Sequence, residues 1–275
     1  MWELFVAFVL GVVEGLTEFA PVSSTGHMII FDDILFQSKE LYSQEVANTF
    51  KVVIQLGSIL AVVFVFKDKF INMLGLERFL TKQKQPASSR LSIIQLFVGI
   101  LPAGILGVLF EDFIDEHLFS VETVLIGLVI GAFLMIAADY FRPKHPQVEA
   151  VENISLKQAF LMGLFQCLAL WPGFSRSGST ISGGVLVGLN HRASSDFTFI
   201  MAVPIMLGAS MLSLYKNWQY FTVDVIPFFV VGFISAFIFA LLAIRFFLKL
   251  INKVKLVPFA IYRIVLAVVI WLIIM

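Results

Sequence analysis

The sequence predicts an all-α integral membrane protein, with six transmembrane helices and two re-entrant hairpins of broken helix arranged as inverted-topology repeats. Of its 275 residues, 59% are hydrophobic and only 14% are charged, whereas soluble domains average about 25% charged residues. Lys and Arg together number 19, as do Asp and Glu, so no basic excess suggests a nucleic-acid partner. Cys167 is the only cysteine, which excludes an internal disulfide and a cysteine metal cluster.

The first element type is the spanning helix, which needs about 20 mainly apolar residues. Stretches that meet or approach this length are 52–66, 91–110, 121–140, 197–214, 225–244 and 256–275.

The second element type is the broken hairpin, expected in the apolar regions 2–36 and 160–189. Each region is interrupted near its middle by proline, glycine, serine and charged residues. Proline removes a helical hydrogen bond, and glycine and serine favour turns. Each region therefore reads as two short helices joined by a broken tip.

The connecting segments predict the orientation in the membrane. Segment 67–90 is rich in basic residues, as are the stretch after residue 140 and segment 245–255, whereas segment 111–120 has acidic residues and no Lys or Arg. The positive-inside rule places the first three in the cytoplasm and the acidic segment outside. Both termini then lie outside, the first hairpin enters from the outer face and the second from the cytoplasmic face.

An internal repeat is expected within a single membrane domain, 1–275, with repeat 1 at about 1–140 and repeat 2 at about 155–275. Gly, Leu, Pro and Ser recur in the same order in segments 11–26 and 163–178. The alternative is that two Gly/Ser-rich kinks are alike by composition alone. Because each half has a hairpin and three crossings, the repeats would be inverted, with a site at their interface near the bilayer centre.

The first hairpin contains acidic and hydroxyl groups suited to catalysis. Glu14 and Glu18 are four residues apart, so both carboxylates lie on one helical face. A hard divalent cation, Mg²⁺ or Ca²⁺, would relieve the repulsion between them. The tip then supplies three hydroxyls and an imidazole, from Ser23, Ser24, Thr25 and His27, and a serine beside an imidazole is a nucleophile-and-base arrangement.

The second hairpin contains a predicted phosphate-binding turn at 172–180. Glycines would let the backbone approach a ligand, a guanidinium would supply a bidentate fork, and hydroxyls would add donors. The residues concerned are Gly173, Ser175, Arg176, Ser177 and Thr180. Arg263, inside the last span, would either meet phosphate or extend to the cytoplasmic headgroups.

A purely structural ion pair between the hairpins is the alternative explanation for these charges. Each ionised group costs about 2.5–3.5 kcal/mol at a helix centre, so pairing or a ligand is required. The ion pair alone would explain neither His27 nor the hydroxyls. Among the remaining polar residues, Gln55 lines the site or bonds a neighbouring helix, and His117, His145 and His191 are expected to be solvated.

With both motifs, and with segments 53–60 and 258–263, the chain resembles the bacterial undecaprenyl-diphosphate phosphatase family, the one linked to bacitracin resistance. The resemblance covers the whole length. It implies removal of the terminal phosphate from the C55 isoprenyl diphosphate, which regenerates the monophosphate carrier lipid for peptidoglycan. It also implies a multi-pass inner-membrane enzyme that is activated by a divalent cation and reached from the periplasm. The family's acidic pair falls on Glu14 and Glu18, its histidine on His27, and its phosphate-binding set on Ser175, Arg176 and Thr180.

The expected roles leave alternatives open. Ser24 or Ser23 attacks the phosphoryl group with His27 as base, or metal-activated water attacks directly. Without the resemblance, an ion-coupled transporter or a lipid flippase would use the same inverted-repeat site. The glycines of 127–131 would pack against a second subunit or within the chain, so a monomer and a homodimer are both allowed.

Overall fold

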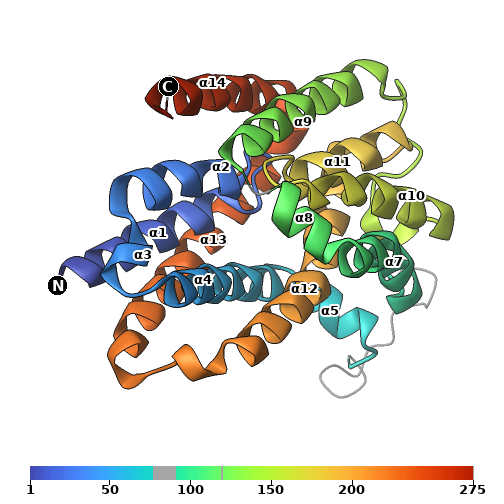
Figure 1. Ribbon diagram of the computed structural model, residues 1–275. Helices are drawn as coiled ribbons and strands as arrows, with labels where there is room; N and C mark the ends of the chain where they lie inside the picture. Colours follow the sequence, from blue (N-terminus) through green and yellow to red (C-terminus); the bar gives the residue numbers. More distant parts are fainter. Residues whose placement is uncertain (77–90, 119, 275) are drawn as a thin grey trace.

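The computed structural model describes residues 1–76, 91–118 and 120–274 (Figure 1). Within these ranges the chain is helical and forms no strand. The described residues hold five helices that are long and apolar enough to cross a membrane. They are α4 (Gln44–Val65), α9 (Val121–Phe141), α12 (His191–Lys216), α13 (Ile226–Val254) and α14 (Val257–Ile274). Large apolar side chains remain exposed along them, so the predicted membrane class is confirmed.

Several helix bounds differ from those expected. Helix α4 begins well before residue 52, because the Ser43 side chain caps it by accepting from the Val46 N–H at 3.3 Å. Helix α13 continues past residue 244 through the basic segment, so that segment is helical rather than a loop. Helix α7 (Ile93–Leu109) has only 17 residues, and the expected acidic loop contains helix α8 (Glu111–His117).

Shorter elements connect these helices. They are α3 (Ser38–Leu41), α5 (Lys67–Met73), η3 (Val151–Asn153), η5 (Trp218–Tyr220) and η6 (Val223–Val225). Part of the basic segment used for orientation, with Glu77, Arg78, Lys82, Lys84 and Arg90, lies outside the described residues.

Both expected hairpins are interrupted helices. The first consists of α1 (Trp2–Thr17), then α2 (Ser24–Met28), which continues as η1 (Ile29–Phe36); the second consists of α10 (Leu156–Cys167), η4 (Leu168–Leu170) and α11 (Arg176–Leu186). At the tips, Ser23 and Ser175 have positive φ angles of 70° and 71°, a region that non-glycine residues rarely adopt. Each serine caps the following helix by accepting from a glycine N–H, that of Gly26 or Gly178.

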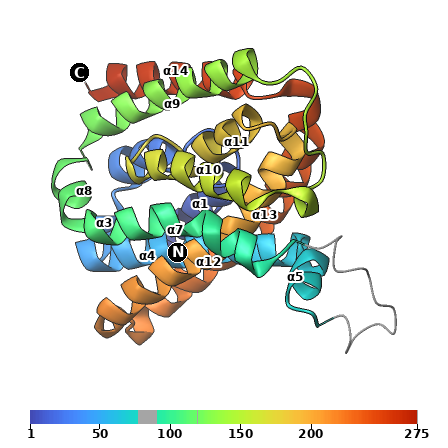
Figure 2. The ribbon, with the colours of Figure 1, turned by 90° about the vertical axis from the view of Figure 1, so that its right-hand side faces the viewer.

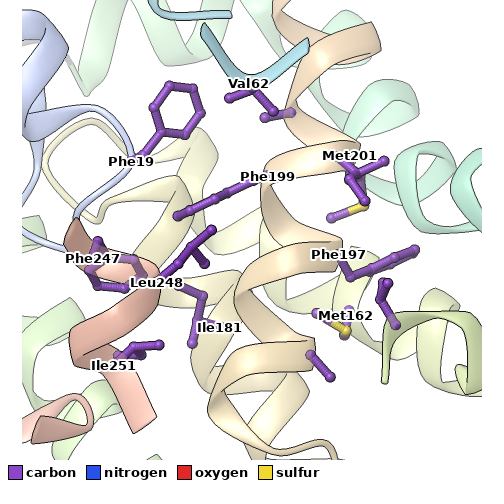
Figure 3. Close-up of a cluster of buried hydrophobic side chains, with 14 of the residues drawn as sticks. Phe19, Val62, Met162, Ile181, Phe197, Phe199, Met201, Phe247, Leu248 and Ile251 are labelled. Carbon is purple, nitrogen blue, oxygen red and sulfur yellow. The ribbon is translucent and has the colours of Figure 1, made fainter. Parts of the chain in front are cut away.

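The hairpins pack into a bundle of the longer helices. Helix α1 lies against α13, α10 against α7, and α14 against α9 (Figures 1 and 2). The main core lies where the hairpin tips meet α12 and α13 (Figure 3). There Phe19 packs on Phe199 with ring centroids 5.2 Å apart, and Phe199 lies 5.8 Å from Phe247. The first tip is therefore held against packed aromatic side chains.

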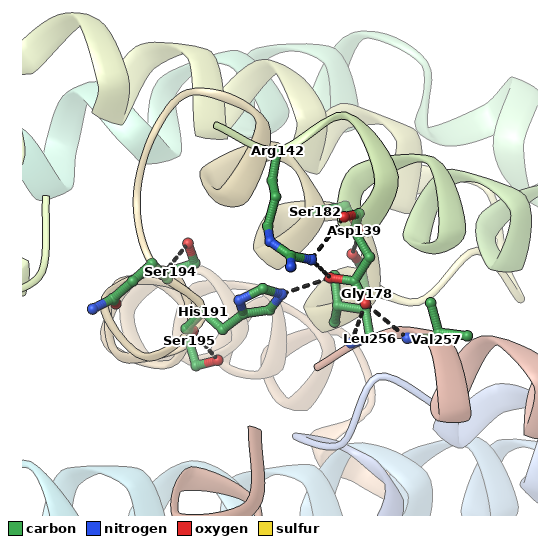
Figure 4. A network of polar contacts seen from close by, with 10 residues as sticks. Asp139, Arg142, Gly178, Ser182, His191, Ser194, Ser195, Leu256 and Val257 are labelled. Atoms are coloured by element: carbon green, nitrogen blue, oxygen red, sulfur yellow. Dashed lines mark hydrogen bonds and ion pairs between the residues drawn. The ribbon is translucent and has the colours of Figure 1, made fainter. Parts of the chain in front are cut away.

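A buried polar cluster joins three helix ends (Figure 4). Asp139 accepts from His191 Nε2 at 2.6 Å and from the N–H groups of Leu256 and Val257 at 2.8 and 3.0 Å. It therefore caps the start of α14. The expectation that His191 is solvated is wrong, because its side chain is only 9% exposed and is bonded to this carboxylate.

Candidate active site

The Glu18 carboxylate lies between groups from both hairpins. The Ser24 hydroxyl donates to Glu18 Oε2 at 2.7 Å, and Arg176 Nη2 donates to Glu18 Oε1 at 3.0 Å. Glu18 directly follows α1, Ser24 begins α2, and Arg176 begins α11. The structure thus brings together an acid and a guanidinium that are 158 residues apart in the sequence, as the two motifs predicted.

Arg176 is fixed by more than its ion pair. Its Nη1 donates to the Thr198 carbonyl oxygen at 3.4 Å, and its guanidinium carbon lies 5.7 Å from the centre of the Phe19 ring. The side chains of Arg176 and Glu18 are 15% and 9% exposed. A guanidinium has five N–H donors, so donors remain available to a phosphate at this position.

His27 does not contact Ser24 as the nucleophile-and-base hypothesis expected. Its Nδ1 lies 2.8 Å from the Ser23 carbonyl oxygen, and its Nε2 lies 2.7 Å from the Tyr262 hydroxyl. The acceptor beside the Ser24 hydroxyl is Glu18 instead. Sequence reasoning gave Tyr262 no role; the only signal was its place in segment 258–263, which carries part of the family resemblance.

Glu14 is the second carboxylate of the site, and one of its oxygens is buried without a hydrogen-bond partner. Its side chain is 2% exposed, and its Oε1 has no hydrogen-bond partner. It lines a cavity of about 290 Å³ together with Ser24, Thr25, Asp33, Lys51 and Gln55. Of the two expectations for Gln55, the structure therefore supports lining the site.

The carboxylates fit a cation that is held partly by substrate. No group of three or more His, Cys, Asp or Glu residues that could hold a metal occurs in the part of the chain that the structure describes. Mg²⁺, however, is commonly held by one or two carboxylates together with waters and substrate phosphates. Glu14 and Glu18 provide such a donor set, and the unpartnered Glu14 oxygen is the observation that favours it.

The hydroxyls of the second hairpin are mostly used within the fold. Ser177 Oγ lies 3.2 Å from Ser175 Oγ and donates to the carbonyl oxygen of Ala20 at 3.1 Å, so it links the two tips. The Thr180 hydroxyl is fully buried in α11 and has no hydrogen-bond partner.

Two predicted ligand-binding residues lie inside the packing instead. Gly173 has φ +87°, and a Cβ there would lie 2.2 Å from the Val124 carbonyl oxygen, so this glycine permits contact with α9 rather than with a ligand. Its own carbonyl accepts from Arg263 Nη2 at 2.9 Å. Arg263 is 0% exposed and also donates to the Gly127 carbonyl at 3.2 Å, so it neither faces the cavity nor reaches the headgroups.

The glycines at 127–131 pack within the chain. A Cβ on Gly127 would lie 2.6 Å from the Pro172 carbonyl oxygen, and one on Gly131 would lie 2.6 Å from that of Phe174. These glycines therefore accommodate the second hairpin, and they give no reason to expect a second subunit at this surface.

An apolar groove of about 430 Å³ lies beside the first tip. His27 and Tyr262 form a polar part of its wall, and Phe246, Phe247, Leu250 and Phe259 are among its apolar residues. A mainly apolar wall with a few polar groups suits an amphipathic lipid.

A known protein family matches nearly the whole chain. Residues 7–269 match the family described as bacitracin resistance protein BacA. The chain belongs to this family.

Three similar proteins are named undecaprenyl-diphosphatase. The undecaprenyl-diphosphatase of Geobacillus sp. (strain WCH70) is 68% identical over 271 residues, which is 98% of each chain. The undecaprenyl-diphosphatase of Anoxybacillus flavithermus is also 68% identical, over 98% of this chain and 97% of its own. That of Bacillus subtilis (strain 168) is 64% identical over 100% of this chain and 99% of its own.

Proposed function

We propose that this protein is an undecaprenyl-diphosphate phosphatase, which converts the C55 isoprenyl diphosphate to the monophosphate carrier lipid and phosphate for peptidoglycan synthesis. The observation that carries the proposal is the Glu18 carboxylate, which bonds both the Ser24 hydroxyl and the Arg176 guanidinium. The similarity to enzymes of that name over nearly the whole chain supports it. The groove beside His27 suits the isoprenyl tail.

The contacts suggest a covalent route for the reaction. Ser24 Oγ attacks the terminal phosphorus while its proton passes to Glu18 Oε2, and the bond from that phosphorus to the bridging oxygen breaks. The lipid monophosphate leaves. Water then attacks the phosphorus, the bond from phosphorus to Ser24 Oγ breaks, and the proton on Glu18 returns to that oxygen. The proton lost by the water passes through Glu18 to the departing phosphate, which leaves Glu18 ionised again. Free Arg176 donors stabilise the charge on the transferred phosphoryl oxygens.

Glu14 and Glu18 would hold the divalent cation, Mg²⁺ or Ca²⁺, which when bound neutralises charge on the diphosphate oxygens. Two of the predicted phosphate ligands do not contact substrate in this scheme. Ser177 links the two tips through its bond to Ala20, and Thr180 is fully buried.

The proposed arrangement has six spans and two re-entrant hairpins in two inverted repeats, in the inner membrane. Supporting it, the tip serines share one unusual backbone conformation. In addition, the first helix of each hairpin packs on the second predicted span of the other half, α1 on α13 and α10 on α7.

The active site is proposed to face the periplasm. Helix α8, with its acidic first turn, lies at the left in Figure 2, whereas α5 and the connections before α10 and α14 lie at the right. Placing the basic end in the cytoplasm puts α8 and the C-terminus, both at the left in Figure 2, outside. The N-terminus is proposed to lie outside as well. The cavity residue Lys51 belongs to the first half of α4 and pairs with Asp33 of η1. Figure 1 shows the start of α4 on the same side as the N-terminus.

Phosphate release from a polyprenyl diphosphate by the detergent-purified protein tests the function, measured with and without a chelator. We expect release that is lost with chelator and restored by Mg²⁺ or Ca²⁺. Ser24→Ala should abolish it, and acid-quenched wild type should contain phosphoserine at residue 24. Full activity in Ser24→Ala would end the covalent route in favour of attack by water. Absence of release from the wild type would favour the transporter or flippase alternative.

A further inference from the structure

Two hydrogen bonds fix the ring of His27. Nδ1 lies 2.8 Å from the Ser23 carbonyl oxygen, which can only accept, so Nδ1 carries the proton. In the neutral ring Nε2 is then an acceptor, and the Tyr262 hydroxyl 2.7 Å away donates to it. The two rings also stack, with centroids 5.6 Å apart and an angle of 11° between their planes.

Tyr262 is itself held in place by the helix that carries it. Its neighbour Arg263 is fully buried and bonded to the turn of the second hairpin through the Gly173 carbonyl. At its start, α14 is capped by Asp139. Adjacent residues of one helix therefore contact the tips of both hairpins, which fixes the position of the Tyr262 hydroxyl relative to His27.

The edge of the His27 ring that Tyr262 contacts faces the apolar groove and not the cavity of Ser24. Tyr262 and His27 line the apolar groove, whereas the Ser24 hydroxyl is bonded to Glu18 and lines the separate polar cavity. The imidazole Nε2 is thus directed toward the groove, where the lipid part of the substrate would lie. Glu18 and His27 consequently lie beside different parts of a bound polyprenyl diphosphate.

We propose that Tyr262 is a positioning residue for the phosphatase reaction. The Ser23 carbonyl sets the Nδ1–H tautomer of His27, and the Tyr262 hydroxyl, which donates to Nε2, fixes the ring so that Nε2 faces the groove of the lipid monophosphate that leaves and not the attacking serine. This inference rests on the proposed function. Without the hydroxyl, the ring keeps its bond to Ser23 but loses the partner that selects its orientation.

Tyr262→Phe tests the inference because it keeps the stacked ring and removes only the hydroxyl. We expect kcat to fall about 3- to 10-fold, the effect of losing one hydrogen bond, with KM nearly unchanged. The matched control is Tyr215→Phe, since Tyr215 is 80% exposed, and it should behave as wild type. Wild-type kcat in Tyr262→Phe would overturn the proposal.

A double-mutant cycle separates positioning from a general structural effect. In a His27→Gln background, Tyr262→Phe should cause no further loss, because the group through which it acts is gone. An equal loss in both backgrounds would mean that the hydroxyl acts without His27 and would overturn the proposal.

A spectroscopic measurement does not depend on turnover. The chain has only four histidines, so nitrogen-15 histidine labelling gives few ring signals, and His27→Gln assigns those of His27. We expect the wild type to show the Nδ1–H tautomer, and Tyr262→Phe to shift the His27 Nε2 signal while the other histidines stay unchanged. An unmoved Nε2 signal would refute the positioning role. Failure of the wild type to release phosphate would instead refute the proposed function, whatever the spectrum shows.

Discussion

Replacement of Glu18 by glutamine tests which group takes the proton from Ser24. The carboxylate now accepts two hydrogen bonds, from Ser24 at 2.7 Å and from Arg176 at 3.0 Å. Glutamine has the same shape but offers one oxygen and one NH₂ group. Since a guanidinium can only donate, the amide oxygen must face Arg176 and the NH₂ group must face Ser24. The serine hydroxyl then accepts a hydrogen bond, and its proton no longer points at a base.

The magnitude follows from these two contacts. A positioned general base contributes about 10²–10⁴-fold to the rate, so kcat of Glu18→Gln should fall by about that factor. Arg176 keeps an acceptor but loses its carboxylate partner, which costs about 1–3 kcal/mol of stability. At a saturating concentration of Mg²⁺, which offsets the weaker metal binding by an amide oxygen, KM should change far less than kcat, because Arg176 is still available to the phosphate.

The assay is the initial rate of phosphate release from a detergent-solubilised polyprenyl diphosphate over a range of substrate concentrations. Glu40→Gln is the matched control, since Glu40 is exposed at α3 and should leave the rate unchanged. If Glu18→Gln kept more than about a tenth of wild-type kcat while His27→Gln lost about 10²–10⁴-fold, His27 would be the base and the reasoning from the Ser24 contact would be refuted.

Three further predictions follow from other contacts. Arg176→Lys should lower kcat/KM by about 10²-fold, because an ammonium lacks the planar fork that bonds Glu18 and phosphate together; near-normal kinetics would contradict the clamp. Asp139→Ala should destabilise the protein by about 2–4 kcal/mol by removing the α14 cap and the His191 partner, and an unchanged melting temperature in detergent would contradict this. Gly173→Ala should impair folding, because a Cβ would lie 2.2 Å from the Val124 carbonyl oxygen at a positive φ, and monodisperse, wild-type-like protein would contradict it. Its control, Gly208→Ala, has no atom within 4 Å of the added Cβ and should be neutral or stabilising by up to about 1 kcal/mol.

The same contacts explain why some predicted site residues are not ligands for phosphate. Arg263 and Gly173 were predicted to bind phosphate because a guanidinium and a glycine turn suit that ligand. In the structure they bind each other, because the positive φ of Gly173 lets the turn approach α9 closely enough for its carbonyl to meet the buried guanidinium. The sequence alone does not distinguish a buried arginine that binds backbone carbonyls from one that binds phosphate.

The sequence by itself determined the features that depend on local pattern. Apolar runs determined the membrane class, prolines with nearby Ser and Gly determined the two helix breaks, and the spacing of Glu14 and Glu18 predicted a common helical face. Only the tertiary structure decided which groups meet across the chain. Glu18 rather than His27 accepts the hydrogen bond from the Ser24 hydroxyl. His27 is instead bonded to Tyr262, 235 residues away in the sequence. The physical reason is that a hydrogen bond requires two atoms within about 3 Å of each other, a condition set by how helices pack and not by their composition.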